Sequence, residues 1–119
     1  MKSIHLIAVL LFGLFTTSNL SAQTATIKKE TIKVWGNCGS CKKKIEKAAK
    51  AAGATAANWN EDTQELKISY NSNNSSSEKI QQSIANVGYD TQDFKGDDQA
   101  YKKLDACCKY PRKAVAAKP

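Results

Sequence analysis

Two cysteines in the stretch "GNCGSC", Cys38 and Cys41, have the spacing C-x-x-C. Thiolate sulfur binds soft metals, acts as a redox nucleophile and forms disulfides, so three kinds of site are open. Two intervening residues let both sulfurs converge on one ion from a short loop. We favour a metal clamp, with a thiol–disulfide exchange pair and a structural disulfide as alternatives.

Ligand softness and ligand number indicate which metal this pair would bind. Soft thiolates select Cu(I), Zn(II) or Hg(II), and a two-sulfur site suits Cu(I) and Hg(II), whereas Zn(II) prefers four ligands. Cys41 is predicted in the first turn of a helix, where free N–H groups and the helix dipole favour an anion. Lys42, Lys43 and Lys44 add positive charge. We therefore expect a lowered thiol pKa and a thiolate near neutral pH.

A second thiol pair, Cys107 and Cys108, lies close to the C-terminus. Adjacent cysteines rarely bond to each other, because the resulting ring is strained. They could form a second soft-metal site, or fold back on Cys38 and Cys41 to give three or four sulfurs. Such a site would hold Zn(II) or bind Cu(I) more tightly. A disulfide to the core, or two surface thiols, is the alternative.

Hydrophobic periodicity predicts the elements that position these residues. Apolar residues recur on one helical face over 41–52, which predicts a helix. They alternate over 26–35, weakly over 54–60 and clearly over 65–70, which predicts three strands. A second helix is expected to start with a capping box of Ser75 and Glu78 and to end at Gly88. A short last strand is predicted over 89–94.

The element order β-α-β-β-α-β predicts an α+β, ferredoxin-like sandwich of four antiparallel strands with both helices on one face. In this layout the loop after the first strand and the loop before the last strand meet at one end, which brings Tyr89 toward the first cysteine pair. After residue 96 a short helix capped by Asp97 is expected, with Tyr101 and Leu104 inward. The basic, alanine-rich residues 109–119 are predicted to be disordered.

The N-terminus has the features of a secretory signal peptide: Lys2, an apolar run from Ile4 to Phe15, and the small residues Ser21 and Ala22. An uncleaved anchor is the alternative. We expect the organisation 1–22 signal peptide, 23–96 core domain and 97–119 appendage. Signal removal lowers the formal net charge from +7 to +6, because Lys2 is lost. The mature chain is expected to be periplasmic or secreted, without a membrane span.

The stretch "VWGNCGSCKKKIEKAAKAAG", with "GYD" at 88–90, resembles the heavy-metal-associated domain family over residues 26 to about 95. This family includes copper chaperones, domains of copper-pumping ATPases and periplasmic mercury-binding proteins. The resemblance implies that Cys38 and Cys41 are the metal ligands and that Tyr89 shields the site. It also raises the expectation that Lys42, Lys43, Lys44 and Lys47 dock an acidic partner by charge complementarity. A merely solvated helix face is the alternative.

One departure from the family pattern concerns the loop. The family usually has Gly-Met-Thr/His-Cys, whereas this chain has Gly36-Asn37-Cys38, which is one residue shorter and lacks the buried Met. We expect Trp35 or Asn37 to take over the loop packing. Trp59 is expected in the core or the hairpin.

Several function classes are disfavoured. The single histidine, His5, lies in the signal peptide, and no Ser-His-Asp set or phosphate loop is visible, so we expect no enzyme. Nucleic acid is not expected, because the basic face has no interleaved aromatic residues. "WGNCGSCK" superficially resembles the thioredoxin motif, but that fold needs a proline opposite it, and the prolines stand at 111 and 119.

The sequence thus predicts an exported soft-metal-binding protein, a metallochaperone or scavenger. We expect it to bind Cu(I), or alternatively Hg(II) or Zn(II), and to pass the metal on by ligand exchange. The expected partner is a metal transporter or another thiol-rich metal protein with an acidic face. Thiol–disulfide exchange through the same two cysteines is the alternative function.

Overall fold

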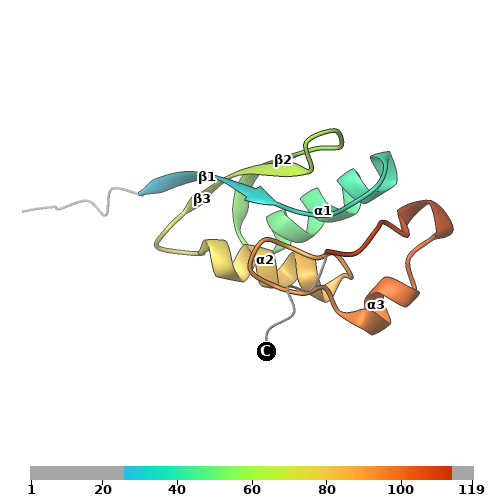
Figure 1. The fold of residues 1–119 in the computed structure, drawn as a ribbon. Coiled ribbons are helices and arrows are strands. Elements are labelled where there is room, and N and C mark those ends of the chain that lie inside the picture. The colour runs from blue at the N-terminus through green and yellow to red at the C-terminus, as the bar shows by residue number, and fades with distance from the viewer. Residues whose placement is uncertain (1–25, 114–119) are drawn as a thin grey trace, which may run out of the picture.

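The computed structural model describes residues 26–113, and the predicted signal peptide and the last six residues lie outside this range. The elements are β1 (Ile27–Lys33), α1 (Gly39–Ala51), β2 (Ala54–Asn60), β3 (Glu65–Asn71), α2 (Ser77–Asn86), α3 (Asp98–Lys102) and the 3-10 turn η2 (Ala106–Cys108). The sheet forms one layer, and α1 and α2 cover one of its faces (Figure 1). Within 26–113 no helix is long and apolar enough to cross a membrane.

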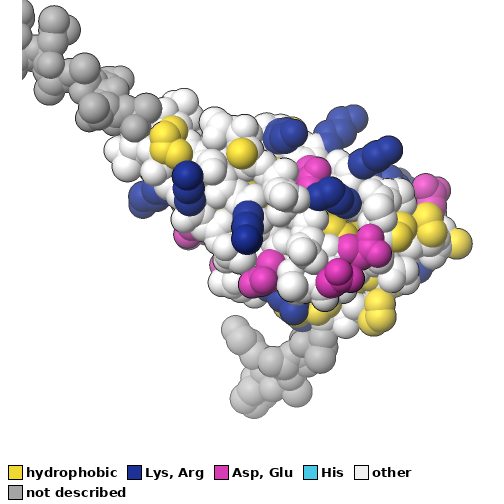
Figure 2. Space-filling model, turned by 90° about the horizontal axis from the view of Figure 1, so that it is seen from above, with side chains coloured by type: hydrophobic (Ala, Val, Ile, Leu, Met, Phe, Trp, Pro, Cys, Tyr) yellow, Lys and Arg dark blue, Asp and Glu magenta, His cyan; other side chains and the backbone are white. Residues whose placement is uncertain are grey.

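The sheet has the strand order β1-β3-β2, and both pairs are antiparallel. The register places Leu66 opposite both Ile32 and Trp59, and all three side chains are buried. The alternation predicted for β3 is confirmed, because Leu66, Ile68 and Tyr70 are buried on the helix side. The face seen from above relative to Figure 1 carries Lys and Arg side chains interspersed with Asp and Glu (Figure 2).

Helix α1 packs on the sheet through Cys41, Ile45, Ala48 and Ala49, as the periodicity predicted. The helix starts two residues earlier than expected, so that Cys38 is its N-cap residue. Gly53 ends it with a φ of 108°, a conformation that favours glycine over residues with a Cβ.

The predicted fourth strand over 89–94 was wrong. Only Thr91 forms a ladder pair, an isolated antiparallel bridge to Val34. The chain turns back there instead of extending, because the Thr91 N–H donates to the Phe94 carbonyl at 2.8 Å and the Phe94 N–H donates to the Thr91 hydroxyl at 3.1 Å. The ferredoxin-like arrangement is kept with a three-stranded sheet, and residues 90–92 still lie beside the end of β1.

The predicted capping box of α2 was also wrong by one residue. Ser76, not Ser75, is the N-cap, and its hydroxyl accepts from the Lys79 N–H at 3.1 Å. The Ser75 hydroxyl instead donates to the Ala52 carbonyl at 2.5 Å, which ties the end of α1 to the start of α2.

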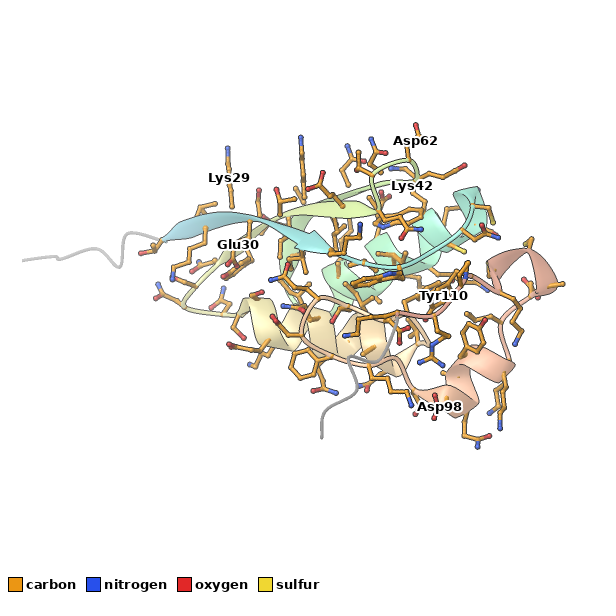
Figure 3. The ribbon with its side chains drawn as sticks, in the orientation of Figure 1. Lys29, Glu30, Lys42, Asp62, Asp98 and Tyr110 are labelled. Atoms are coloured by element: carbon orange, nitrogen blue, oxygen red, sulfur yellow. The ribbon has the colours of Figure 1, made fainter. Side chains whose placement is uncertain are left out.

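The C-terminal appendage packs against the domain. Asp97 caps α3 as predicted, accepting from the N–H groups of Gln99 and Ala100. Tyr101 and Leu104 pack against the core. The expected disorder was wrong for residues 109–113, since Tyr110 is 1 % exposed. Its side chain points into the molecule, in contrast to the outward-pointing Lys29 and Asp62 (Figure 3). The appendage is therefore anchored to the domain and passes the N-terminal end of α1 (Figure 1).

Candidate metal site

Three cysteine sulfurs form one cluster at the N-terminal end of α1. The Sγ atoms of Cys38, Cys41 and Cys108 all lie within 4.8 Å of one another. The distance between the Cys38 and Cys41 sulfurs is 4.0 Å. Cys41 and Cys108 are buried and Cys38 is half-exposed. The sulfur of Cys107 is exposed and lies outside this trio, 4.0 Å from the Cys108 sulfur.

The loop that carries Cys38 is fixed from the core side by Trp59. A Cβ on the buried Gly36 would lie 2.8 Å from the Trp59 ring, so the ring fills the space beneath the loop. The Trp59 indole N–H donates to the Val34 carbonyl at 2.9 Å. The Gln64 side chain donates to the Gly36 carbonyl at 2.8 Å. Trp59 is thus a core residue, as predicted, and it also supports the short loop.

Trp35 packs against the core, as expected, and Asn37 connects the loop to the appendage. The Asn37 side chain donates to the Cys107 carbonyl at 3.0 Å, which connects the loop to the appendage. Trp35 is half-buried, and the ammonium groups of Lys33 and Lys113 each lie 5.6 Å from its ring centroid. The appendage therefore contacts both Asn37 and Trp35.

Local hydrogen bonds lower the pKa of Cys38 to about 6. The largest contribution comes from the Ser40 hydroxyl, 3.1 Å from the sulfur, followed by the backbone N–H groups of Cys41 and Ser40. These groups stabilise the thiolate because donors to a charged group favour that form. The sequence had assigned this effect to Cys41 and to the lysines. Ser40 was missed, although its place between the two cysteines was a usable signal.

Burial dominates the electrostatics deeper in the cluster. It raises the pKa of Cys108 above its ordinary value. The pKa of Cys107 is also raised, because the Cys38 and Cys108 sulfurs outweigh the opposite effect of Ser40. The cluster therefore combines Cys38, a thiol that ionises readily, with Cys108, whose burial disfavours the thiolate form.

Tyr89 lies beneath the sulfurs and is fully buried. Its hydroxyl has no hydrogen-bond partner among the described residues. Burial raises the pKa of this hydroxyl first, and the neighbouring Cys41 and Cys108 sulfurs raise it further. The Tyr89 ring stacks on the Tyr110 ring at a centroid distance of 5.6 Å. The topology thus brings Tyr89 to the cysteines, as the loop arrangement predicted.

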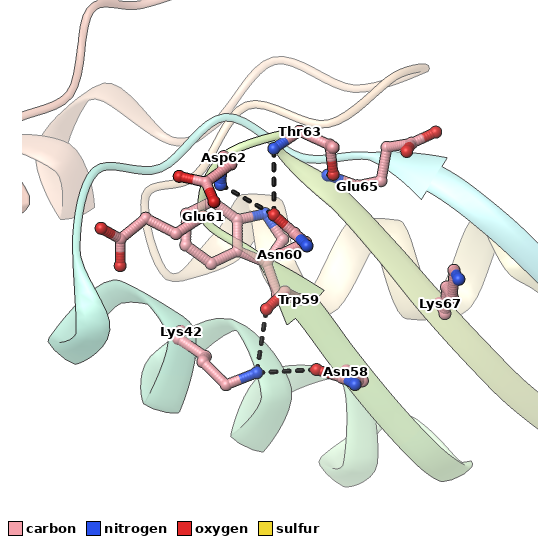
Figure 4. Close-up of a pocket in the computed structure, with 9 residues that line it drawn as sticks. All are labelled: Lys42, Asn58, Trp59, Asn60, Glu61, Asp62, Thr63, Glu65 and Lys67. Carbon is pink, nitrogen blue, oxygen red and sulfur yellow. Dashed lines mark hydrogen bonds between the residues drawn. The ribbon is translucent and has the colours of Figure 1, made fainter.

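The lysines of α1 fall into two groups. The Lys42 ammonium donates to Asn58 Oδ1 at 2.7 Å and to the Trp59 carbonyl at 2.9 Å (Figure 4). It also pairs with Glu46 at 2.7 Å. It lines a surface cavity of about 410 Å³ whose lining includes none of the four cysteines.

The other three predicted docking lysines of α1 differ in whether the appendage pairs with them. Lys44 lies 3.6 Å from Asp105 of the appendage. Lys43 and Lys47 are exposed. Of the predicted docking residues, these two are the ones that the described structure leaves available on the surface.

The family model described as "Heavy-metal-associated domain" matches residues 37–90. Among solved structures, a CopZ metallochaperone is similar at 27 % identity and a TM-score of 0.52, covering 54 % of this chain and 98 % of that one. A proposed copper-ion-binding protein from Bacillus anthracis is similar in fold at 24 % identity and a TM-score of 0.54, covering 58 % and 100 %. No curated protein matches the chain.

The family match covers the part of the chain that contains the first cysteine pair, α1, the hairpin of β2 and β3, and α2. The family match ends at Asp90, so Cys107 and Cys108 lie outside it. The resemblance to the heavy-metal-associated domain family is therefore confirmed over residues 37–90.

Proposed function

We propose that this protein is a metallochaperone that binds Cu(I) between Cys38 and Cys41. The observation that carries the proposal is the 4.0 Å separation of two sulfurs, one of which has a pKa of about 6. Cys38 is then a thiolate at neutral pH, and thiolate sulfur is the ligand that Cu(I) prefers. Hg(II) would compete for the same sulfurs, because it shares this preference.

Release of the metal follows from the exposure of Cys38. A partner thiolate can reach a metal held there and form a new metal–sulfur bond. As the bonds to the cysteines of this chain break, the metal is transferred to the partner without a change in its oxidation state. We propose that Tyr89 closes the inner side of the site and keeps water from the buried sulfurs.

Docking of the partner falls to Lys43 and Lys47. Lys42 is held by Asn58 and Trp59, so changing it would disturb the hairpin as well as the surface. We expect Lys43→Glu with Lys47→Glu to slow Cu(I) transfer to an acidic, thiol-rich acceptor at low salt, because opposite charges steer association. The matched control is Lys102→Glu with Lys103→Glu on the appendage. Equal rates for the two double variants would exclude the docking role.

The binding experiment is a competition between reduced protein and a chromophoric Cu(I) chelator without oxygen. Replacing Cys38 and Cys41 by serine should abolish competition, while replacing the exposed Cys107 should not. If the double variant withdraws Cu(I) as well as the unchanged protein does, the proposed function is wrong. Hg(II) and Zn(II) titrations of the same proteins rank the alternative metals.

Thiol–disulfide exchange remains the second candidate, because a low-pKa thiol beside a buried one also suits that chemistry. Its test is reduction of a protein disulfide substrate by the dithiol form. Turnover that is lost in the same double variant would support it, and no turnover above free dithiothreitol would exclude it.

We also propose export, on the strength of the N-terminal sequence. Cell fractionation followed by N-terminal sequencing of the protein tests this. A mature protein that starts at Gln23 outside the cytoplasm is the expected result. Recovery of the full-length chain from the cytoplasm would contradict the proposal.

A further inference from the structure

The appendage places a third sulfur where a metal bound to Cys38 and Cys41 would lie. Resting on the proposed function, we infer that Cys108 is a third thiolate ligand and that Cys107 is not a ligand. The site is then a three-sulfur site that this chain completes by itself. Cys108 lies outside the matched family domain, so the inference rests on the geometry of this chain.

The sulfur distances fit a three-coordinate ion. With a metal–sulfur bond of about 2.3 Å, as zinc thiolates have, three sulfurs around one ion lie about 4.0 Å apart, whereas two sulfurs in a line lie about 4.6 Å apart. The Cys38 and Cys41 sulfurs are 4.0 Å apart, and all three pairs lie within 4.8 Å. Small side-chain rotations therefore suffice to close the trio on a metal.

A second observation also indicates a ligand at this place. The Tyr89 hydroxyl is buried beside Cys41 and Cys108 and has no partner within residues 26–113. A buried hydroxyl without a partner costs free energy, and it would gain an acceptor when either sulfur becomes a metal-bound thiolate. The Ser40 hydroxyl, 3.1 Å from both the Cys38 and the Cys108 sulfurs, is a second donor to the same trio.

The appendage holds Cys108 in place through its own contacts with the domain. Two residues after Cys108, the Tyr110 hydroxyl donates to the Gly88 carbonyl at 2.7 Å and accepts from the Asp90 N–H at 2.8 Å. Arg112 then pairs with the Asp90 carboxylate at 2.7 Å. Because Gly88 and Asp90 flank Tyr89, the segment that carries the buried tyrosine also anchors the chain that carries Cys108.

Cys107 has the opposite arrangement. Its carbonyl accepts from Asn37 and faces the Cys38 sulfur at 3.4 Å, whereas its own sulfur is exposed. The backbone of Cys107 thus orients the loop, and its thiol is the matched control for that of Cys108.

Cys108 as a ligand affects metal release. A partner thiolate that attacks the metal must displace Cys108 before a two-coordinate exchange can proceed. The metal should therefore leave the unchanged protein more slowly than it leaves a Cys108 variant. Since even outer-shell partners of metal ligands change affinity by about 10- to 100-fold, loss of Cys108 should lower Cu(I) affinity at least about tenfold.

The experiment is X-ray absorption at the copper K edge on full-length mature protein loaded with one equivalent of Cu(I). We expect three sulfurs per copper in the unchanged protein and in Cys107→Ser, and two in Cys108→Ser. Cys108→Ala serves as a second variant, because it puts no polar group at a buried position. Sedimentation of the same samples checks that the chain is monomeric.

Each outcome separates this inference from the proposed function. Two sulfurs in the unchanged protein would overturn the role of Cys108 and leave the Cys38–Cys41 clamp intact. A third sulfur that persists in both Cys108 variants, or that depends on protein concentration, would also overturn it. Failure of the unchanged protein to bind Cu(I) would overturn the proposed function itself.

Discussion

Arg112 forms a bidentate ion pair with Asp90, with Nε 2.9 Å from Oδ2 and one terminal nitrogen 2.7 Å from Oδ1. Asp90 directly follows Tyr89 at the end of the family domain, and Arg112 lies four residues after Cys108. The Asp90 carboxylate also accepts from the Gly96 and Lys113 N–H groups. This pair therefore joins the two parts of the chain that meet at the sulfur cluster.

Replacing Arg112 by Met should destabilise the protein by about 2 to 3 kcal/mol, because it leaves a buried carboxylate without its cation. This cost is below the roughly 3 to 5 kcal/mol usual for a fully buried ion pair, since the Arg112 side chain is 25 % exposed while that of Asp90 is 1 % exposed. The control is Lys95→Met, which breaks an exposed pair with Asp98 and should cost no more than about 0.5 kcal/mol. Urea unfolding of both variants measures the difference, and equal costs would contradict this account of the anchor.

The Arg112 effect should depend on pH. Burial alone would raise the pKa of Asp90, but Arg112 and the Gly96 and Lys113 N–H groups together outweigh burial and hold that pKa below its ordinary value. The stabilisation is thus fully present above the ordinary carboxyl pKa of about 3.9 and is lost as pH falls through the lower folded value. The stability gap between the unchanged protein and Arg112→Met should therefore narrow below about pH 4. A gap that stays constant down to pH 2 would exclude the carboxylate as its source.

Two stacked tyrosines should respond differently to loss of their hydroxyls. Tyr110→Phe leaves the Gly88 carbonyl and the Asp90 N–H without partners and should cost about 1 to 3 kcal/mol. Tyr89→Phe removes a hydroxyl that has no partner within the described residues, so the metal-free protein should be equally or more stable. Thermal unfolding of the two metal-free variants checks this. A larger loss for Tyr89→Phe would show that its hydroxyl has a partner.

The loop before Cys38 should tolerate no side chain at Gly36. Gly36→Ala places a Cβ 2.8 Å from the Trp59 ring and should cost about 1 to 3 kcal/mol by overpacking. Gly39→Ala meets nothing within 4 Å and lies in the first turn of α1, so its effect should stay within about 0.5 kcal/mol. Chemical denaturation compares the two. Similar costs would mean that Trp59 does not support the loop.

Cys38 should react as a thiolate well below the pH at which ordinary cysteines do. Its pKa of about 6 predicts that alkylation by iodoacetamide rises around pH 6, since the thiolate is the nucleophile. Ser40→Ala should move this midpoint upward, whereas Ser72→Ala, at the other end of β3, should not. Fragment mass spectrometry locates the label on Cys38. A midpoint that Ser40→Ala leaves unchanged would exclude the hydroxyl as the main cause.

Much of the fold was predictable, because the helices and the hairpin depend on local periodicity. The alternation of Leu66 and Ile68 and the apolar face around Ile45 predicted these elements. The absence of the fourth strand was not predictable in the same way. The Thr91 side chain competes with the ladder by bonding to Phe94, and this local turn has no hydrophobic pattern of its own.

The first cysteine pair could be placed from the sequence, but the third sulfur could not. Cys38 and Cys41 occupy a loop between two predicted elements, so their surroundings follow from the topology. Cys108 is held near them by the ion pair between Asp90 and Arg112, which stands 22 positions later in the chain. In the sequence, Asp90 could pair with any of several distant basic residues. Only the folded structure shows which of them it contacts.

The most direct test of the account is a crystal structure of the Cu(I)-loaded mature protein with data collected at the copper absorption edge. We predict one anomalous peak per chain, within bonding distance of the sulfurs of Cys38 and Cys41, with Cys108 as the third neighbour. A copper peak bound away from both Cys38 and Cys41 would contradict the central claim.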